Sequence, residues 1–539
     1  MTNYLILKLG LLADLIRVAL SEAWLFLKQR SLANQNLNQL FPLVRNSQKP
    51  KTLLVINLSN MNYNVCIESL MAKAFSERGY KVVFLTNWSN KRAAKTFCFL
   101  GGQVLYHYWL FIQKGFVFLT KRLPLLGEIK DLKNYEWEGV NIGNSVIGSL
   151  AAKFRVGRLD WQNYKVQKMA QKYLWRSIIY LETAKDIVAK VKPDLAIAND
   201  KGYMGSNEIF NWVVKQKIDF IQWCACHESN ALMIKRYHQG NRRDHPFSVS
   251  LNTWTRLKSQ PWNESWQKEV YDIFERGYLG QNWFQYKKLA DDLQTISKNE
   301  LVRKYQLNPQ KKIAVLFSHV MWDANLFYGD DLFGEGFEQW FCESAKAMLK
   351  NPNVNWLIKI HPANKFKHDL ENIQSDYREI TALKQTFGRL PKDIKIIYPE
   401  DNINPFSLFN IIDYGITVRG TIGAELPCYG VPVLTAGTGR YSGRGFTVDS
   451  ESPQEYLKRL EHIQDISRLS EGQRRLAILH AYAFFKLRPL KFTSWLDRGF
   501  GAQRDVEIKI KSMAETLDIN YFADWAVNSQ QEDLLNHGL

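Results

Sequence analysis

The chain has 539 residues, of which 46% are hydrophobic, a composition typical of a globular protein with roughly two to four domains. The formal net charge of +18 favours anionic partners such as nucleotide phosphates, anionic glycans or lipid head groups. The sequence contains no long Lys/Arg tract and no zinc-finger spacing, which argues against nucleic acid as a partner.

The N-terminal region, residues 1–50, is predicted to be an amphipathic helix over Tyr4–Lys28 followed by a linker. Charged residues interrupt its apolar run, so it lacks a membrane-spanning stretch, and no signal-peptide cleavage pattern follows it. The helix either packs against the protein or lies on a membrane surface. Six scattered cysteines indicate a reducing compartment. These features predict a cytoplasmic protein, with peripheral attachment to the inner face of the cytoplasmic membrane as an open alternative.

Residues 51–245 are predicted to form a first Rossmann-like domain. The strand Thr52–Leu58, the helix Val65–Arg78 and the strand Lys81–Thr86 form a β-α-β pattern. The turn after the first strand lacks the G-x-G-x-x-G fingerprint, which argues against a dinucleotide here. Its Asn-rich loop, residues 59–64, either holds an acceptor sugar or is an ordinary surface loop.

Two later strands of this half, Asp194–Ala198 and Asp219–Cys226, end in polar residues. Carboxyl ends of parallel strands are where α/β enzymes place catalytic groups. Asp200 and His227 are therefore the candidate catalytic bases, with Glu208 and Glu228 as further candidates. Each of these residues, taken alone, is more often structural.

The segment Trp109–Leu126 mixes large apolar residues with lysine and arginine. It is either a core helix with solvated lysines or a patch that touches lipid. Residues 246–305 are predicted to be a helical interdomain region.

The second Rossmann-like domain, residues 306–480, is predicted to bind the donor. Its strand Lys312–Phe317 ends at Ser318, and Asp323 follows in the next loop. The strand Trp356–Ile360 carries Lys359 and ends at His361 and Pro362. A His-Pro pair can simply end a strand, but here we expect a ligand contact.

The stretch from Asp413 to Gly443 reads as strand, turn, short helix, strand. Thr421 fits a helix N-cap, and Arg419 beside it adds a fixed positive charge, so the turn is suited to a phosphate or diphosphate. Glu425 is either a ribose ligand or a surface carboxylate favoured by the helix dipole.

A glycine-rich loop follows the last strand of this stretch and carries Arg440. The arginine either contacts the donor sugar or belongs to a mobile surface loop.

Three segments in this half resemble a known family: KIAVLFSHVMWDANLF, LIKIHP and TVRGTIGAELPCYGVPVLTAGTGRYSGRGFT, which together span roughly residues 312–450. They resemble the second domain of bacterial capsule polysaccharide biosynthesis proteins, GT-B glycosyltransferases related to capsular Kdo transferases and, through the His-Pro motif, to bacterial sialyltransferases. The resemblance implies that His361, Pro362, Gly420 and Thr421 contact the nucleotide phosphate. The acidic Asp-Asp-Gly motif that carries the sialyltransferase base has no counterpart here.

The predicted fold is therefore α/β of the GT-B type, with two Rossmann-like domains facing a central cleft and a C-terminal helical tail at residues 481–539. The predicted activity is a metal-independent, cofactor-free glycosyltransferase that moves a sugar from a nucleotide-sugar donor to a glycan or lipid-linked acceptor in bacterial surface polysaccharide biosynthesis. A CDP-polyol phosphotransferase, a sugar-nucleotide epimerase and a non-catalytic capsule assembly or export component remain alternatives. The predicted donor-binding residues are Ser318, Asp323, Lys359, His361, Pro362, Arg419, Gly420, Thr421, Glu425 and Arg440.

Overall fold

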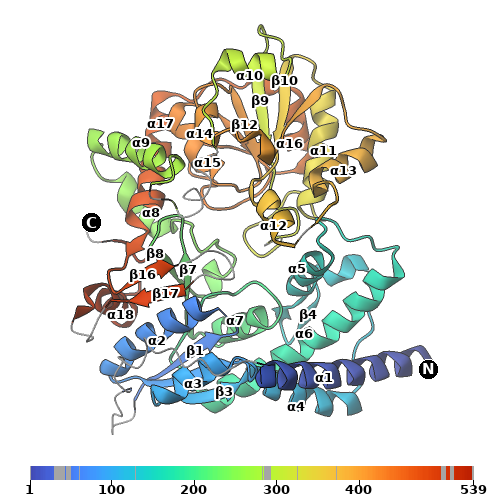
Figure 1. The fold of residues 1–539 in the computed structure, drawn as a ribbon, viewed down its shortest axis with the longest axis vertical. Coiled ribbons are helices and arrows are strands. Elements are labelled where there is room, and N and C mark those ends of the chain that lie inside the picture. Colours follow the sequence, from blue (N-terminus) through green and yellow to red (C-terminus); the bar gives the residue numbers. More distant parts are fainter. Residues whose placement is uncertain are drawn as a thin grey trace. The chain divides into compact units, whose positions relative to one another are not determined.

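The chain divides into two compact units, seen in the computed structural model of Figure 1. Unit 1 comprises Met1–Leu150, Trp161–Arg242 and Pro489–Asn536, and unit 2 comprises Ala151–Asp160, Arg243–Arg488 and His537–Leu539. The region expected between the domains, residues 246–305, thus falls in unit 2. The structure describes residues 2–28, 43, 50–59, 61–127, 129–281, 283, 293–323, 326–371, 373–498, 505–509 and 515–536. Most of the predicted linker after Lys28 lies outside the described residues.

Unit 1 alternates strands and helices along most of its length. Its helices are α1 (Thr2–Lys28), α2 (Asn62–Glu77), α3 (Lys91–Phe99), α4 (His107–Thr120), α5 (Gly143–Phe154, which runs on into unit 2), α6 (Tyr164–Val191), α7 (Ser206–Lys215) and α18 (Leu517–Asn528). Its strands are β1 (Thr52–Asn57), β2 (Lys81–Thr86), β3 (Gln103–Tyr106), β4 (Glu136–Trp137), β5 (Val140–Asn141), β6 (Leu195–Ala198), β7 (Asp219–Ala225), β8 (Ala231–Tyr237), β15 (Leu490–Lys491), β16 (Trp495–Arg498) and β17 (Asp505–Ile508).

The main sheet of unit 1 has seven strands in the order β15-β8-β7-β6-β1-β2-β3. Strands β3, β2, β1, β6 and β7 are parallel, and β8 and β15 add antiparallel pairs at one edge. The chain builds outward from β1 to β3, then returns to the other side of β1 with β6. This reversal is the topological switch point of a doubly wound fold, where ligands bind at the carboxyl ends of the strands.

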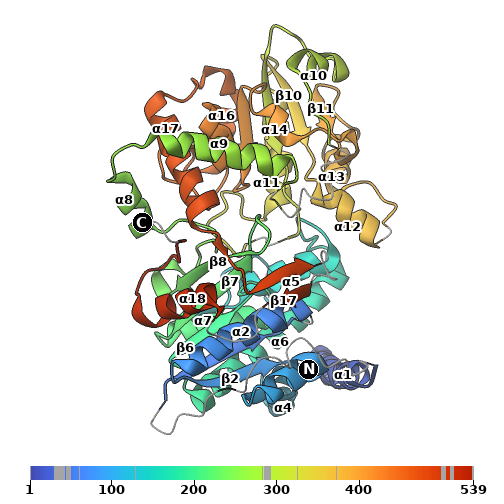
Figure 2. The ribbon, with the colours of Figure 1, turned by 60° about the vertical axis from the view of Figure 1, so that its left-hand side comes forward.

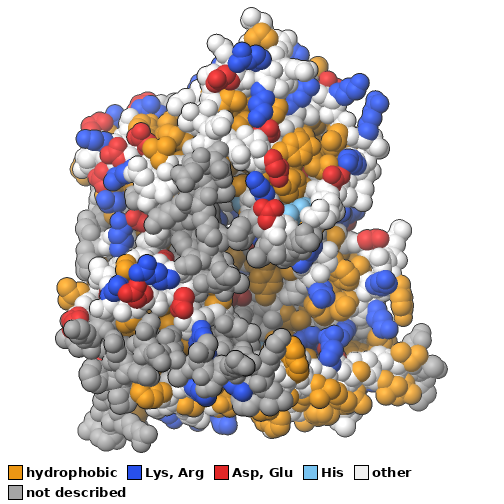
Figure 3. All heavy atoms as spheres, in the orientation of Figure 1, with side chains coloured by type: hydrophobic (Ala, Val, Ile, Leu, Met, Phe, Trp, Pro, Cys, Tyr) orange, Lys and Arg blue, Asp and Glu red, His pale blue; other side chains and the backbone are white. Residues whose placement is uncertain are grey.

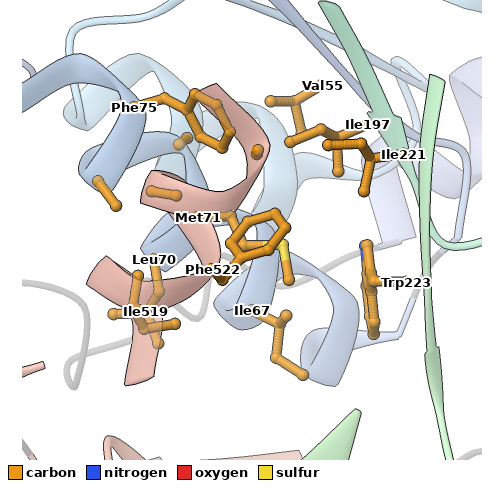
Figure 4. Packing of buried hydrophobic residues seen from close by; sticks show 14 of the residues in the cluster. Val55, Ile67, Leu70, Met71, Phe75, Ile197, Ile221, Trp223, Ile519 and Phe522 are labelled. Carbon is orange, nitrogen blue, oxygen red and sulfur yellow. The ribbon is translucent and has the colours of Figure 1, made fainter. Parts of the chain in front are cut away.

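The core of unit 1 lies on both faces of this sheet because its central strands are apolar on both sides. On β1, Leu53 and Val55 face a cluster formed with α2 and α18, while Leu54 and Ile56 face a second cluster formed with α6 and α7. This alternation follows from the two-residue period of a strand. Figure 4 shows the first cluster, with Met71 and Phe75 of α2 and Phe522 of α18 packed beside the sheet.

The C-terminal part of unit 1 contributes strands as well as a helix, in contrast to the helical tail predicted for residues 481–539. β15 joins the main sheet, β16 and β17 pair with each other, and α18 packs against α2, as Figure 2 shows. Within that tail the sequence favours a closing helix over Ile508–Trp525. The helix α18 begins later, at Leu517, and part of the favoured range lies outside the described residues.

Unit 2 carries a second parallel sheet. Its helices are α8 (Leu251–Lys258), α9 (Glu264–Tyr278), α10 (Lys298–Lys304), α11 (Phe337–Leu349), α12 (Ala363–Glu371), α13 (Arg378–Phe387), α14 (Pro405–Leu408), α15 (Ile422–Glu425), α16 (Pro453–Glu461) and α17 (Glu471–Tyr482). Its strands are β9 (Lys312–Phe317), β10 (Val354–Lys359), β11 (Ile394–Ile397), β12 (Tyr414–Thr417), β13 (Val433–Thr435) and β14 (Val448–Asp449).

The sheet of unit 2 has the order β11-β10-β9-β12-β13-β14, and every pair of neighbours is parallel. When the strands of this sheet are numbered in chain order from β9, they lie side by side in the order 3-2-1-4-5-6. This is the Rossmann order, and its switch point lies between β9 and β12. Helices α11, α13 and α16 pack on one face through a buried apolar cluster. The predicted α/β class with two Rossmann-like halves is confirmed, and the central cleft between them stays a prediction.

Candidate functional site

In unit 2 the loops that follow β9 and β12 meet at the switch point. His319 follows β9, and its Nε2 accepts hydrogen bonds from the backbone N–H of Val418 at 3.3 Å and of Arg419 at 3.5 Å. The Thr417 hydroxyl is 3.2 Å from the same nitrogen. Because Nε2 accepts, the ring proton of neutral His319 sits on Nδ1. The imidazole thus joins two strand ends about one hundred residues apart in the chain.

Arg419 is the central cation of this site. Its side chain is 6% exposed and forms an ion pair with Asp331, whose side chain is equally buried. Among the described residues, its Nε and Nη1 have no hydrogen-bond partner although they are buried. A guanidinium presents a planar fork of donors that matches phosphate oxygens, and unsatisfied buried donors are costly. The two free nitrogens therefore indicate a place for an anionic ligand.

Two glycines allow the loops around Arg419 to pack closely. Gly439 lies so close to Arg419 that an added Cβ would come within 2.7 Å of the arginine Cβ. Gly423 leaves room for the hydroxyl of Tyr441, which donates a hydrogen bond to the carbonyl of Gly420 at 2.8 Å. These contacts hold the loop after β13 against the turn after β12. The glycine-rich pattern of the sequence thus serves close packing of the site.

His361 follows β10 and is held by a buried polar chain. Its backbone N–H donates to the Ser318 hydroxyl oxygen at 3.0 Å, and that hydroxyl donates to Glu379 at 2.7 Å. Its Nδ1 accepts from the N–H of Ala363 at 3.2 Å, so the neutral ring carries its proton on Nε2. Burial, and next the charge of Lys367, lowers the pKa of His361 to about 4. Ser318 is 4% exposed and helps to position His361, and its predicted contact with the donor stays a prediction.

Electrostatic interactions link His319, His361, Arg419 and Arg440 into one cluster. Burial lowers the pKa of His319 well below its ordinary value, and the charges of Arg419, His361 and Arg440 lower it further. Burial also lowers the pKa of Arg440 to about 10. Both imidazoles are therefore neutral donors at pH 7, surrounded by permanent cations. Such a cluster is suited to an anion that supplies the missing negative charge.

Lys359 gives this cluster a testable pH dependence. Its side chain is buried at 6% exposure, and burial lowers its pKa to about 8. A bound phosphate favours the charged amine, so affinity for a nucleotide should be highest below about pH 8 and fall up to about tenfold per pH unit above it. The phosphate itself, with its second pKa near about 6, does not titrate in that range.

Calorimetric titration of a nucleoside diphosphate between about pH 7 and about pH 9.5 checks this expectation. The Lys359→Met variant should bind more weakly at pH 7 and show a flat profile. Exposed Lys350→Met is the matched control and should retain the slope. Equal slopes in the wild type and Lys359→Met would exclude Lys359 from the phosphate site.

Other predicted donor residues are placed differently from the expectation. Thr421 is exposed and stands at the N-cap position of α15, as predicted, but its side chain makes no capping hydrogen bond. α15 spans only four residues before a 3-10 turn that contains Pro427. Glu425 is 1% exposed and accepts a hydrogen bond from the Tyr278 hydroxyl at 2.9 Å. A ribose contact through Glu425 stays a prediction. Burial raises the pKa of Glu425 to about 7.

The remaining members have partners within unit 2. The Arg440 guanidinium lies 3.2 Å from Nε2 of His245 and over the ring of Phe247. Asp323 accepts from Lys367 at 2.9 Å and is 44% exposed. The charge of Arg440 acts on His319 and so belongs to the cluster, whereas Asp323 is paired with Lys367. Pro362 is half-buried beside His361.

Unit 1 holds a polar cavity of about 240 Å³ at its own switch point, between the carboxyl ends of β1 and β6. Its lining includes Asn57, Asn64, Glu68, Asn199 and Asp200. Asp200 accepts a hydrogen bond from the N–H of Gly202 at 3.1 Å, and burial raises its pKa. The structure thus brings Asp200 and the Asn-rich loop, both singled out in the sequence, to one pocket.

Glu68 forms the wall of this cavity and was not predicted. It is fully buried on α2, where it accepts hydrogen bonds from Asn57 and from the indole N–H of Trp223. Burial raises the pKa of Glu68 to about 8, so the group is mostly neutral at pH 7. Glu68 lies in the middle of a helix that is recognised by its apolar residues, so nothing in the sequence marks this glutamate as a residue of the cavity. The cavity therefore contains one carboxyl group that is protonated and another, Asp200, whose pKa is raised.

Glu68→Gln should change the pH dependence of stability. The folded protein keeps the Glu68 proton that the unfolded chain releases, so this group favours folding most below about pH 4.5, and its contribution declines as pH rises to about 8. The variant should lose that decline and exceed the wild type in thermal stability above about pH 8. Melting temperatures across this range check it, with exposed Glu77→Gln on the same helix as control. If the melting temperature of Glu68→Gln declined with pH as steeply as that of the wild type, the claim that Glu68 is a buried neutral carboxyl group would be contradicted.

The other candidate bases of unit 1 have structural partners. Glu208 is fully buried and accepts hydrogen bonds from Ser145, Ser177 and the N–H of Gly205, so it caps α7. Glu228 pairs with Lys491 at 2.6 Å. His227 lies in the hairpin turn between β7 and β8 and does not line the cavity. Among the four candidates, Asp200 lines the pocket.

The described residues contain no group of three His, Cys, Asp or Glu side chains placed to hold a metal ion. Metal independence stays a prediction. The residues missed by sequence reasoning are His319, Asp331, Glu379 and Glu68. His319 and Asp331 stand in loops that the sequence marked as strand ends, whereas the two glutamates are visible only through their buried contacts.

No protein-family model matches the sequence, and no curated protein matches it. Among solved structures, a KpsC beta Kdo 2,4 transferase from Thermosulfurimonas dismutans is 12% identical with a TM-score of 0.33, over 61% of this chain and 87% of the other. A UDP-GlcNAc 2-epimerase from Neisseria meningitidis is 10% identical with a TM-score of 0.27, over 81% and 97%. A glycosyltransferase from Rickettsia africae is 9% identical with a TM-score of 0.26, over 81% and 93%.

At these identities and TM-scores the likeness transfers no activity to this chain. Kdo transferases are nevertheless among the proteins that the sequence motifs resemble. The structural neighbours of this chain thus include KpsC Kdo transferases, other glycosyltransferases and sugar-nucleotide epimerases.

Proposed function

We propose that this protein is a glycosyltransferase that binds the phosphates of a nucleotide-sugar donor at the switch point of unit 2. The observation that carries the proposal is Arg419, whose two buried guanidinium nitrogens have no hydrogen-bond partner among the described residues. The backbone N–H of Arg419 donates to Nε2 of neutral His319, and the charge of Arg419 contributes to the lowered pKa of that ring, at the carboxyl end of a Rossmann-type sheet. This is the position where such sheets bind nucleotides.

The cluster would act on the leaving group. As the bond between sugar and phosphate breaks, negative charge grows on the phosphate oxygens. Arg419, Lys359 and the ring N–H of His361 are fixed donors that stabilise that charge without reorganisation. We expect this chemistry to need no metal ion, because cationic side chains of the protein supply the positive charge.

The cavity of unit 1 would hold the acceptor, with Asp200 as the general base. Asparagine and serine side chains in its lining offer the donors and acceptors that sugar hydroxyls need. Burial raises the pKa of Asp200 toward the range in which a carboxylate removes a proton more effectively. Asp200 would take the proton from the acceptor hydroxyl as that oxygen attacks the anomeric carbon. We expect domain closure to bring donor and acceptor together and to exclude water.

The acceptor is proposed to be a glycan or a lipid-linked glycan of bacterial surface polysaccharide biosynthesis. This finer assignment follows the motif resemblance over residues 312–450. The test is release of free nucleotide from a panel of sugar nucleotides, with and without a glycolipid fraction. Release that requires acceptor supports transfer. No release with any donor and acceptor pair would contradict it.

A sugar-nucleotide epimerase is the second candidate, and one observation favours it. Asp200 and Glu68 line the same cavity, and paired acids are what an epimerase would use on the two faces of a sugar. Such an enzyme converts its substrate without acceptor. A new sugar nucleotide formed by the protein alone would favour the epimerase over the transferase.

A further inference from the structure

The long N-terminal helix α1 buries its acidic side chains and exposes many of its apolar ones. Its two acidic residues face inward: Asp14 is 3% exposed and pairs with Lys172, and Glu22 is 4% exposed and accepts hydrogen bonds from the N–H and hydroxyl of Ser89. Its apolar residues face outward. Those exposed by 45% to 65% are Leu5, Ile6, Leu9, Ile16, Leu20 and Trp24.

These exposed residues form one continuous face. At about 100° per residue, all six fall within an arc of about 100° on the helix. An ordinary surface helix of a globular protein turns such a stripe to the core and its charges to water. Here the stripe faces away from the unit that the helix packs on, so burial within unit 1 does not account for it.

Helix α4 extends the apolar surface. α1 is fixed to it by Lys8, whose amine donates to the Phe118 carbonyl at 2.7 Å, and by the N–H of Leu123, which donates to the Tyr4 hydroxyl oxygen at 2.8 Å. Beyond this contact, α4 and the segment after it expose Trp109, Phe116, Val117 and Leu125 by 47% to 53%. Figure 3 shows hydrophobic side chains gathered over the region of α1 and α4, with basic side chains between them.

The helices that form this surface expose mainly cations, and a carboxylate of the neighbouring α6, Asp186, pairs with Lys114 of α4. From Arg78 to Gly127 the sequence contains eight Lys and Arg and no Asp or Glu. Lys121 and Arg122, directly after α4, are exposed, and the side chain of Arg17 on α1 is 69% exposed. Since both acids of α1 are buried, α1, α3 and α4 expose cations and apolar groups without an exposed carboxylate of their own.

We infer that the α1–α4 surface docks on an anionic lipid bilayer. An apolar stripe with an aromatic residue, flanked by Lys and Arg, is the pattern of helices that lie in the membrane interface. The apolar side chains would enter the boundary between head groups and acyl chains, and the flanking cations would contact the anionic head groups. No helix in the described part of the chain is long and apolar enough to cross a bilayer. The inference is independent of the proposed function.

The test is co-sedimentation of the full chain with vesicles. Wild-type protein should bind equimolar phosphatidylcholine–phosphatidylglycerol vesicles and bind pure phosphatidylcholine vesicles much more weakly. Leu9→Glu and Leu20→Glu should each lower binding to the anionic vesicles by about ten- to a hundredfold. Lys121→Gln with Arg122→Gln should lower it about tenfold or more at low salt and flatten its salt dependence.

Leu251→Glu is the matched control, because Leu251 is 68% exposed on α8 of unit 2. It should bind vesicles like the wild type. All variants change exposed side chains and should keep the wild-type melting temperature. Failure of the wild type to bind anionic vesicles would overturn the inference. A dimer in solution that Leu9→Glu dissociates would assign this surface to a second copy of the chain instead.

Discussion

Replacing Arg419 with methionine is expected to lower kcat/KM for sugar transfer by about 10² to 10³, a loss of about 3 to 4 kcal/mol of transition-state stabilisation. Methionine keeps much of the side-chain volume but removes the two nitrogens that have no hydrogen-bond partner in the described part of the chain. Nucleotide affinity should fall as well, because the same group holds the phosphates in the ground state. Steady-state kinetics together with calorimetric titration of the nucleotide measure both effects.

Arg419→Met also removes the ion pair between Arg419 and the buried carboxylate of Asp331. That alone destabilises a fold. The double variant Arg419→Met with Asp331→Asn removes both charges and should recover folding without recovering activity. Arg419→Lys keeps the charge but loses the planar fork and should be intermediate. Full activity in a folded Arg419→Met protein would remove Arg419 from the donor site.

Asp200→Asn is expected to lower kcat by about 10² to 10⁴ while leaving donor binding unchanged. The amide preserves the size and the acceptor oxygen that receives the Gly202 N–H, but it cannot take a proton from the acceptor hydroxyl. The discriminating readout is a split result: nucleotide affinity equal to that of the wild type, and turnover lost. Exposed Asp524→Asn in the same unit should retain both.

A fall in nucleotide affinity equal to the fall in turnover would contradict the role of base and indicate a structural defect. The pH profile adds a second check, since the wild-type rate should rise with pH through the raised pKa of Asp200 and the residual rate of the variant should not. Retained turnover in Asp200→Asn would move the base to another residue of the cavity.

Much of the fold was predictable because the central strands are short apolar runs bounded by turn residues. The predicted strands Lys81–Thr86 and Lys312–Phe317 have the bounds of β2 and β9. The short edge strands β3 and β11 were not anticipated. Their residues are only partly buried and alternate less clearly, so local pattern gives little signal for them.

The site was predictable only in part, because strand ends are visible in sequence and their mutual contacts are not. Arg419, Lys359 and His361 could be singled out because each stands where a strand ends, and their roles stay predictions. His319 stands at such an end too, yet its role depends on amides about one hundred residues away. Ser318 and Glu425 are buried against Glu379 and Tyr278, contacts that the sequence does not show, and their donor contacts stay predictions.

The most direct test of the central claim is thermal stabilisation by CMP, CDP, UDP, GDP and their sugar conjugates. A ligand that binds only the folded state stabilises it by about 2.7 kcal/mol at one hundred times its Kd. We predict that at least one nucleotide raises the melting temperature of the wild type and that Arg419→Met with Asp331→Asn abolishes the shift. The absence of any shift in the wild type, or an equal shift in the double variant, would contradict a nucleotide phosphate site at the switch point of unit 2.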